Sequence, residues 1–222
     1  DSAVASVLAA KTGLPLICVE MPIHQNKTQV ERGFKHIKWL KEKFLNVSSI
    51  ELELTSIFDE FIVKLPAKNK NELALVNTRA RLRMTTLYYF AQANNSLVLG
   101  TGNKVEDFGI GFFTKYGDGG VDISPIADLL KSEVYALAKE LTINNDIITA
   151  PPTDGLWEDN KTDEEQIGAT YAELEWAMDF NGNKNLLSKR EQEVLQIYTT
   201  LNHTNQHKMT KIPVCIIPKN LK

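Results

Sequence analysis

The feature that most constrains the fold is an apolar run that ends in a tight glycine turn. Residues 96–99 read SLVL, and Gly100, Thr101 and Gly102 follow directly. An apolar run that ends at glycines is typical of a buried strand. In open α/β sheets, ligands bind beyond the carboxyl ends of the strands, and a turn of this kind leaves backbone N–H groups and one hydroxyl facing that crevice. The sequence therefore predicts an α/β fold with a ligand site at this turn.

The loop after this turn carries charges of both signs among glycines. Its charged residues include Glu106, Asp107, Lys115, Asp118 and Asp122, and its glycines are Gly109, Gly111, Gly117, Gly119 and Gly120. Glycines let a backbone approach a ligand closely, carboxylate oxygens can hold Mg²⁺, and a lysine can neutralise phosphate. A solvated turn with incidental charges is the alternative interpretation. We favour the functional one, because connections this long without secondary structure are usually functional or disordered.

Composition narrows the class of protein. Of the 222 residues, 43% are hydrophobic and 24% are charged, which suits one domain with a sizeable core. The formal net charge of -3 gives no basic surface for duplex nucleic acid, so we expect small-molecule partners. No apolar run approaches the roughly 20 residues of a membrane span, and we expect no membrane partner.

The two cysteines indicate the compartment. Cys18 and Cys215 each lie in an apolar, strand-like run, where a small buried thiol is the usual interpretation. Neither a disulfide framework nor a metal-binding spacing is present. We therefore expect a cytoplasmic protein.

The rest of the chain alternates helices with strands. The expected helices cover residues 1–12, 25–44, 55–65, 72–93, 125–141, 162–178 and 188–201, and the expected strands cover residues 14–19, 50–54 and 96–99. Capping boxes that begin at Thr162 and Ser188 mark two of the helix starts. Residues 150–157 contain two prolines and a glycine, which exclude a helix. We expect a flap there, with Trp157 as its hydrophobic latch.

Residues 100–125, GTGNKVEDFGIGFFTKYGDGGVDISP, resemble the signature region of NAD synthetases, members of the N-type ATP pyrophosphatase group. Similar stretches occur at residues 77–84, NTRARLRM, and at residues 151–168, PPTDGLWEDNKTDEEQIG. An isolated pair, His207 and Lys208, follows in a polar segment after the last expected helix. These matches run through nearly the whole chain in the family's order. The resemblance implies a Rossmann-like parallel sheet flanked by helices, in a single domain that covers residues 1–222.

The N-terminus matches only part of a family motif. The family's pyrophosphate-binding loop reads Ser-Gly-Gly-any-Asp-Ser, and Asp1 and Ser2 match its last two positions. The strand before this loop lies in the middle of the family's sheet, so the resemblance leads us to expect further residues upstream of Asp1. The alternative is that Asp1 and Ser2 only cap the helix that follows.

The resemblance implies a ligase that forms a C–N bond. Its reaction is the ATP-dependent amidation of deamido-NAD to NAD with ammonia, the final step of NAD biosynthesis. The nicotinate carboxylate attacks the α-phosphate of ATP and releases pyrophosphate, and ammonia then displaces AMP from the NAD-adenylate. Adenylation gives the carboxylate a good leaving group, and Mg²⁺ stabilises the charge on the phosphates.

The nitrogen donor is expected to be free ammonia. Neither cysteine lies in a glutaminase-like context, and 222 residues leave no room for an amidase domain. Use of glutamine through another domain or subunit stays open.

The family's site residues carry over to three sets of positions. The set expected to bind ATP is Asp1, Ser2, Met21, Thr101, Lys131 and Thr153. The set expected to bind deamido-NAD is Arg81, Lys115, Asp122, His207 and Lys208. The magnesium ligands implied by the resemblance are Asp1 and Glu106. No residue in these sets is a covalent nucleophile, which fits catalysis by positioning and electrostatics.

One departure from the family affects the second metal ligand. Between Glu106 and Lys115 this chain has one residue more than many family members, so Asp107 could replace or assist Glu106. The spacing of Glu106 from Thr101 fits the family, and we therefore keep Glu106.

The resemblance also implies a homodimer, with the helix that carries Arg81 near the interface and the dinucleotide bound between subunits. Two other functions stay open. One is a pyrophosphatase-type ligase or thiolation enzyme with a different acceptor, which should need neither the KYGDGGVD stretch nor His207 and Lys208. The other is a non-enzymatic module that binds ATP without releasing pyrophosphate.

Overall fold

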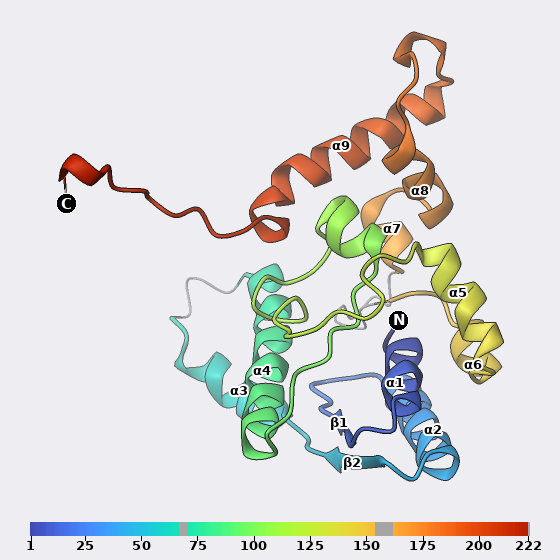
Figure 1. Cartoon of the computed structure of the whole chain (residues 1–222), viewed down its shortest axis with the longest axis vertical. Helices are drawn as coiled ribbons and strands as arrows, with labels where there is room; N and C mark the ends of the chain where they lie inside the picture. The colour runs from blue at the N-terminus through green and yellow to red at the C-terminus, as the bar shows by residue number, and fades with distance from the viewer. Residues whose placement is uncertain (67–70, 154–161, 222) are drawn as a thin grey trace.

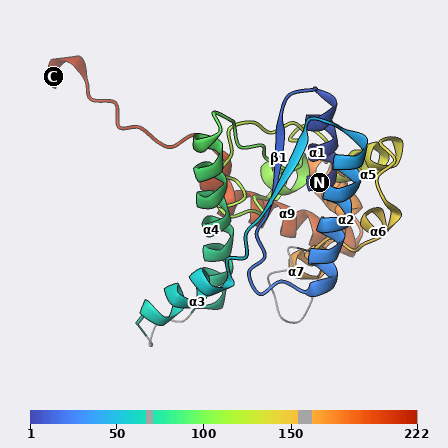
Figure 2. The ribbon, with the colours of Figure 1, turned by 90° about the horizontal axis from the view of Figure 1, so that it is seen from below.

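The computed structural model describes residues 1–66, 71–153 and 162–221, and within them the chain is an α/β protein with parallel strands flanked by helices (Figure 1). Its strands and α-helices are, in order, α1 Ser2–Lys11, β1 Leu16–Glu20, α2 Lys27–Lys43, β2 Val47–Glu51, α3 Thr55–Lys64, α4 Glu72–Ala93, α5 Lys131–Glu140, α6 Asn145–Ile148, α7 Asp163–Ile167, α8 Tyr171–Asp179 and α9 Lys189–Met209. A π-helical segment, Lys104–Ile110, lies between α4 and α5, and two short 3-10 helices cover Lys184–Leu186 and Lys219–Leu221. None of these described helices is both long and apolar enough to cross a membrane. Figure 2 shows β1 between α4 on one side and α1 with α2 on the other. Parallel strands need such cover, because they are usually buried on both faces.

The strands β1 and β2 pair in parallel. Leu16 lies opposite Val47, and beyond the last pair the N–H of Leu52 donates to the carbonyl of Glu20 at 2.9 Å. The strand expected at residues 50–54 therefore begins and ends earlier than its alternating pattern indicated. Val47 starts it because this side chain belongs to the main core cluster.

The strand expected at residues 96–99 is reduced to a single parallel bridge between Leu99 and Ile123. The pairing does not extend further toward the N-terminus, because the N–H of Val98 donates to a side chain, Oδ2 of Asp122, at 2.8 Å and is not available to a neighbouring strand. Gly100 continues this pairing, since its N–H donates to the carbonyl of Ile123 at 2.7 Å.

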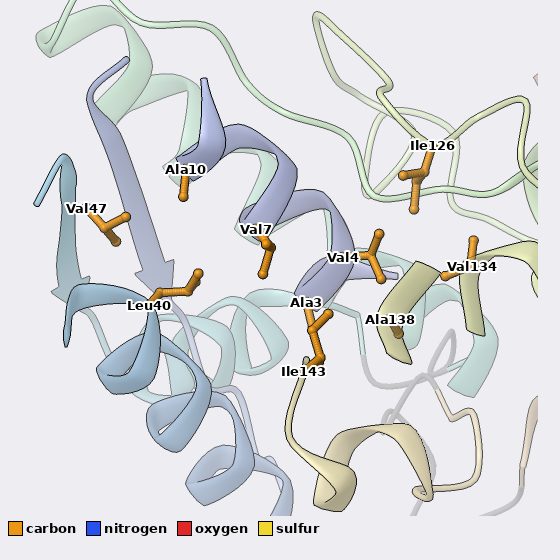
Figure 3. Packing of buried hydrophobic residues seen from close by; sticks show 10 residues of the cluster. All are labelled: Ala3, Val4, Val7, Ala10, Leu40, Val47, Ile126, Val134, Ala138 and Ile143. Atoms are coloured by element: carbon orange, nitrogen blue, oxygen red, sulfur yellow. The ribbon is translucent and has the colours of Figure 1, made fainter. Parts of the chain in front are cut away.

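One core cluster surrounds α1, whose small apolar side chains face α2 and α5 (Figure 3). Its buried members are Ala3, Val4, Val7, Ala10, Leu40, Val47, Ile126, Val134, Ala138 and Ile143. A helix that is apolar around most of its circumference is typically buried. This packing fixes the N-terminus of α1, where Asp1 and Ser2 lie.

A second core cluster joins the π-helical segment to α8 and α9. Its buried members are Val105, Ile110, Ala169, Tyr171, Leu174, Ala177, Val194 and Leu195. The cluster brings Glu106, which lies next to Val105, to the N-terminal end of α8.

The single helix expected at residues 162–178 was wrong. Thr162 caps α7 as expected, but Gly168 ends that helix with a left-handed φ of 85°. Thr170 then opens α8 with a second capping box, in which its side chain accepts from the N–H of Glu173. Glycine adopts the left-handed conformation without steric cost, and this allows the sharp break.

The helix α9 is longer than the one expected at residues 188–201. His207 and Lys208 are therefore helical and do not belong to a following polar segment. The extra turns are held by tertiary hydrogen bonds, such as the one that Asn202 Nδ2 donates to the carbonyl of Gly109 at 2.8 Å. The pattern of apolar residues along the helix cannot predict such tertiary hydrogen bonds.

The helix expected at residues 125–141 begins only at Lys131. The segment before it forms turns, and the carbonyl of Leu129 accepts the N–H of Lys104 at 2.9 Å. This bond ties the start of α5 to the π-helical segment.

The C-terminal apolar run leaves the body of the molecule after α9 (Figures 1 and 2). Cys215, expected to be a buried thiol, is exposed, and Ile216 is 86% exposed, so that expectation was wrong. Cys18 in β1 is half-buried. Trp157, the expected latch, lies outside the described residues.

Candidate active site

Three charged residues from separate elements meet in a buried cluster. Asp1 precedes α1, Glu106 lies in the π-helical segment, and Lys131 opens α5. Lys131 Nζ donates to Asp1 Oδ2 at 2.6 Å and to Glu106 Oε1 at 2.9 Å. The Lys131 side chain is only 7% exposed. The structure therefore brings together the two expected metal ligands and a lysine expected to bind ATP.

Two further residues belong to this cluster, and neither was predicted from the sequence. The hydroxyl of Tyr171 donates to Glu106 Oε1 at 2.5 Å and lies 3.3 Å from Oδ2 of Asp163. Asp163 follows the capping residue Thr162, where a carboxylate is common for helix electrostatics alone. A single tyrosine on an amphipathic helix gives no local signal of its role.

Asn103 is a third residue that the sequence analysis missed. Its Oδ1 accepts the N–H groups of Val105 and Glu106 at 3.1 Å each, and its Nδ2 donates to Asp1 Oδ1 at 3.3 Å. Its position directly after Gly102 was the available signal, because asparagine commonly caps a helical segment. Asn103 fixes the glycine turn to both carboxylates.

The protonation states follow from burial and from Lys131. Burial alone would raise the pKa of Glu106, but the Lys131 ammonium and the Tyr171 hydrogen bond outweigh it and hold that pKa below its usual value. Burial and the adjacent Glu106 charge raise the pKa of Tyr171. At neutral pH, Glu106 is therefore an anion and Tyr171 is a protonated donor.

Asp1 and Glu106 present carboxylate oxygens to the same ammonium. Mg²⁺ prefers oxygen ligands and is usually held by one or two carboxylates together with substrate phosphates. Within the described ranges, no group of three or more His, Cys, Asp or Glu side chains is arranged to hold a metal. The two-carboxylate set fits a magnesium ion that arrives with a nucleotide better than a metal held by protein ligands alone.

Asp107, the alternative ligand, packs elsewhere. A Cβ atom placed on Gly102 would lie 1.9 Å from Oδ2 of Asp107, so this carboxyl rests against the glycine turn. Burial, together with the charges of Glu106 and Asp118, raises the pKa of Asp107 to about 7. Lys131 forms its hydrogen bond with Glu106.

A cavity of about 490 Å³ opens beside the cluster. Five of the six residues expected to bind ATP line it, and they are Asp1, Ser2, Thr101, Lys131 and Thr153. Its volume lies in the range of small-molecule sites, roughly 300–1,000 Å³. Met21, the sixth residue, lines a second cavity.

This second cavity, of about 510 Å³, adjoins the glycine turn. Thr101 lines both cavities, so they meet at that residue. Lys208 of α9 reaches the second cavity and donates to the carbonyls of Gly111 and Phe113 at 2.9 Å each. Arg83, which the sequence analysis did not select, also lines it. Two ligands held in these cavities could react at the turn between them.

The other residues expected to bind deamido-NAD lie around this cavity without lining it. Arg81 Nε donates to the carbonyl of Lys115 at 3.3 Å, and Lys115 Nζ donates to the carbonyl of His207. Asp122 lies apart from these three and accepts the hydroxyl of Tyr88 at 3.0 Å. The structure thus brings Arg81, Lys115 and His207 together and leaves Asp122 next to the strand that precedes the glycine turn.

Comparison with known proteins gives consistent matches over the chain. The family model described as NAD synthase matches residues 1–212. The NH(3)-dependent NAD(+) synthetase of Mycoplasma genitalium is 39% identical over 204 residues, which cover 91% of this chain and 79% of that protein. The NH(3)-dependent NAD(+) synthetase of Syntrophomonas wolfei is 38% identical over 229 residues, which cover 100% of this chain and 86% of that protein.

Solved structures are similar over comparable lengths. The NMN synthetase from Francisella tularensis superposes with a TM-score of 0.83 at 32% identity, covering 98% of this chain and 84% of that chain. The NH3-dependent NAD synthetase from Campylobacter jejuni superposes with a TM-score of 0.72 at 26% identity, covering 96% and 86%.

Proposed function

The chain belongs to the NAD synthase family, and from this premise we propose that it amidates deamido-NAD to NAD with ATP and ammonia, the last step of NAD biosynthesis. In the first half-reaction, a nicotinate carboxylate oxygen bonds to the α-phosphorus of ATP and pyrophosphate leaves. In the second, the ammonia nitrogen bonds to the carboxyl carbon, AMP leaves with the transferred oxygen, and a proton is released. The observation that carries this proposal is the Asp1, Lys131 and Glu106 cluster, which lies beside a cavity that shares Thr101 with a second cavity.

We assign the first cavity to ATP. Asp1, Ser2, Thr101, Lys131 and Thr153 line it, and Met21 would contact the nucleotide from the adjoining cavity. The free N–H groups at the N-terminus of α1 favour an anion there, which supports a phosphate near Ser2. The Lys131 ammonium would neutralise a phosphate oxygen as a point charge.

The residues also fit Mg²⁺. Asp1 and Glu106 would hold it through carboxylate oxygens. We propose Glu106 and not Asp107 as the second ligand, because the ammonium of Lys131 already contacts both Asp1 and Glu106, so a cation is attracted between these two carboxylates. When bound, the ion supplies Lewis acidity and neutralises phosphate charge. Lys131, Tyr171 and Asn103 orient the two carboxylates by the hydrogen bonds described above.

We assign the second cavity to the nicotinate end of deamido-NAD. Lys208 is the cation that reaches this cavity from α9, and it can pair with the nicotinate carboxylate. Arg81, Lys115, Asp122 and His207 are proposed to bind the remainder of the dinucleotide. Holding both substrates at the shared turn supports catalysis by proximity, which needs no covalent nucleophile on the protein.

The domain organisation, the assembly and the location of the protein are further parts of this proposal. We propose that residues 1–222 belong to one NAD synthase domain and that the protein is a cytoplasmic homodimer. Exposed apolar side chains on α3 and α4 support an interface there, with Phe61 46%, Leu73 56% and Tyr89 69% exposed. Free ammonia is the proposed nitrogen donor.

A mononucleotide acceptor is the second candidate. The observation in its favour is the TM-score of 0.83 with the Francisella tularensis NMN synthetase, higher than the 0.72 with the Campylobacter jejuni NAD synthetase. The same adenylation and amidation on deamido-NMN would give NMN. Both acceptors carry the nicotinate group, so the role proposed for the second cavity is the same for either one.

The acceptor is tested by steady-state kinetics with ATP, Mg²⁺ and ammonium, comparing deamido-NAD with deamido-NMN. The proposal requires the larger kcat/KM with deamido-NAD and NAD as the product. A larger kcat/KM with deamido-NMN would replace the first candidate with the second. No amide product from either acceptor would overturn both.

A further inference from the structure

Tyr171 occupies a rigid position at the start of α8. Its side chain belongs to the second core cluster and is 7% exposed. Its N–H donates to Oε1 of Glu164 at 2.8 Å, and the capping box of Thr170 fixes the first turn of the helix. The hydroxyl therefore cannot move far without disturbing the core.

The Tyr171 hydroxyl lies between two carboxylates but has one proton to donate. Oε1 of Glu106 is 2.5 Å away and Oδ2 of Asp163 is 3.3 Å away, so the proton goes to Glu106. Lys131 Nζ donates to the same Oε1 at 2.9 Å. Two donors on one oxygen restrict the orientation of the Glu106 carboxylate.

The aromatic ring of Tyr171 makes a second contact with this cluster. Lys131 Nζ lies 4.8 Å from the ring centroid, within the range of a cation–π interaction. The side chain thus touches the anion through its hydroxyl and the cation through its ring. The two contacts can be tested separately, because replacing Tyr171 by phenylalanine keeps the ring and removes only the hydroxyl.

We infer that Tyr171 is a positioning residue for the reaction, which holds the Glu106 carboxylate in the orientation that a divalent cation requires. The inference rests on the proposed function for its role in turnover. Residues that hydrogen-bond to metal ligands commonly change metal affinity 10- to 100-fold when they are substituted. The competing explanation is that Tyr171 is only a core residue whose hydroxyl found the nearest acceptor.

Cation binding separates these explanations without requiring turnover. Mn²⁺ affinity is measured by electron paramagnetic resonance in the presence of α,β-methylene-ATP, for the wild type, Tyr171→Phe and Tyr198→Phe. Tyr198 packs against the same core cluster and serves as the matched control. We expect Tyr171→Phe to weaken Mn²⁺ binding about tenfold and Tyr198→Phe to bind like the wild type. Equal Mn²⁺ affinity in Tyr171→Phe and the wild type overturns the inference.

Turnover gives a second readout. In Tyr171→Phe the Mg²⁺ concentration for half-maximal pyrophosphate release should rise about tenfold, while kcat at saturating Mg²⁺ stays within about threefold of the wild type. A fall in kcat that excess Mg²⁺ does not reverse would contradict a positioning role. If the wild type makes no NAD while Tyr171→Phe still loses Mn²⁺ affinity, the proposed function fails and the role of Tyr171 in cation binding stands.

A second variant covers the case in which Tyr171→Phe does not fold. Replacement of Tyr171 by 3-fluorotyrosine keeps the ring and the hydroxyl, and its ¹⁹F resonance reports on the hydrogen bond to Glu106. Addition of Mg²⁺ to the complex with α,β-methylene-ATP should shift this resonance, while 3-fluorotyrosine at position 198 should not respond. An unchanged resonance at position 171 overturns the inference.

Discussion

Nζ of Lys131 lies 2.9 Å from Oε1 of Glu106, although the two residues are 25 positions apart in the chain. The same ammonium donates to Oδ2 of Asp1 at 2.6 Å, so a single buried cation contacts two carboxylates. Such a pair is costly to break, because the remaining charges stay buried without compensation. The cluster therefore couples the folding of α5 to the chemistry of the first cavity.

The first prediction concerns this cation. Lys131→Met should reduce pyrophosphate release at least 100-fold and lower the free energy of unfolding by about 3 kcal/mol, since it removes the cation that both buried carboxylates contact. Rates from a pyrophosphate assay and urea unfolding monitored by circular dichroism measure both effects. Lys139→Met, on an exposed position of the same helix, is the control. Wild-type rates in Lys131→Met would refute the proposed role.

The second prediction distinguishes two adjacent carboxylates. Glu106→Gln should reduce turnover at least 100-fold and weaken Mg²⁺ binding, because it removes a charged ligand oxygen. Asp107→Asn should change turnover by less than about tenfold, because Asp107 packs on the glycine turn. Magnesium titrations of pyrophosphate release compare the two variants directly. The reverse ranking would make Asp107 the ligand.

The third prediction concerns pH and Glu20 at the end of β1. Burial, and then the charge of Glu51, raises the pKa of Glu20 to about 7 from an ordinary value of 4.5. Ionisation of this carboxyl therefore opposes folding. The stabilisation of the folded protein by the protonated carboxyl is fully present below pH 4.5 and is lost as the pH rises through 7. Glu20→Gln should stabilise the protein at pH 8 by about 1 kcal/mol, after a discount for solvent screening at this partly exposed site.

Melting temperatures at pH 4.5 and pH 8 test this dependence. The difference between Glu20→Gln and the wild type should be small at the lower pH and clear at the higher one. Glu42→Gln, on an exposed position of α2, should show no such difference. A pH-independent effect of Glu20→Gln would mean that the carboxyl is ionised throughout.

The fourth prediction concerns the break between α7 and α8. Gly168 has a φ of 85°, and a Cβ atom there would find Ile197 at 3.7 Å, so the cost of Gly168→Ala is conformational and not steric. We expect a loss of about 1 kcal/mol in the free energy of unfolding. Gly168→Asn should lose less, because asparagine tolerates the left-handed region better than alanine does. Equal losses in both variants would point to a different cause.

Local sequence signals predicted the bounds of α2 and α4 well. The helix expected at residues 72–93 coincides with α4, since Asn71 caps it and its apolar spacing is sustained over many turns. The end of α9 could not be predicted, because Asn202 bonds to the carbonyl of Gly109 only once the fold has formed. The missed break at Gly168 had a local signal, the second capping box at Thr170.

The site residues also divide into those with a local sequence signal and those without one. Thr101 follows from the glycine turn alone, because the end of a buried strand predicts a ligand there. The roles of Asp1, Lys131 and Arg81 came from resemblance, since single charges on helices are usually solvated. Tyr171 had no signal of either kind, because its partner Glu106 is 65 positions away and only the packing of α8 joins them.

Exchange of radiolabelled pyrophosphate into ATP in the absence of ammonia tests the proposed adenylation step by itself. We expect this exchange to depend on Mg²⁺ and on deamido-NAD, because the adenylate forms reversibly before ammonia acts. It should be lost in Lys131→Met and retained in Lys139→Met. Exchange that occurs without deamido-NAD, or the complete absence of exchange in an enzyme that makes NAD when ammonium is added, would contradict the account.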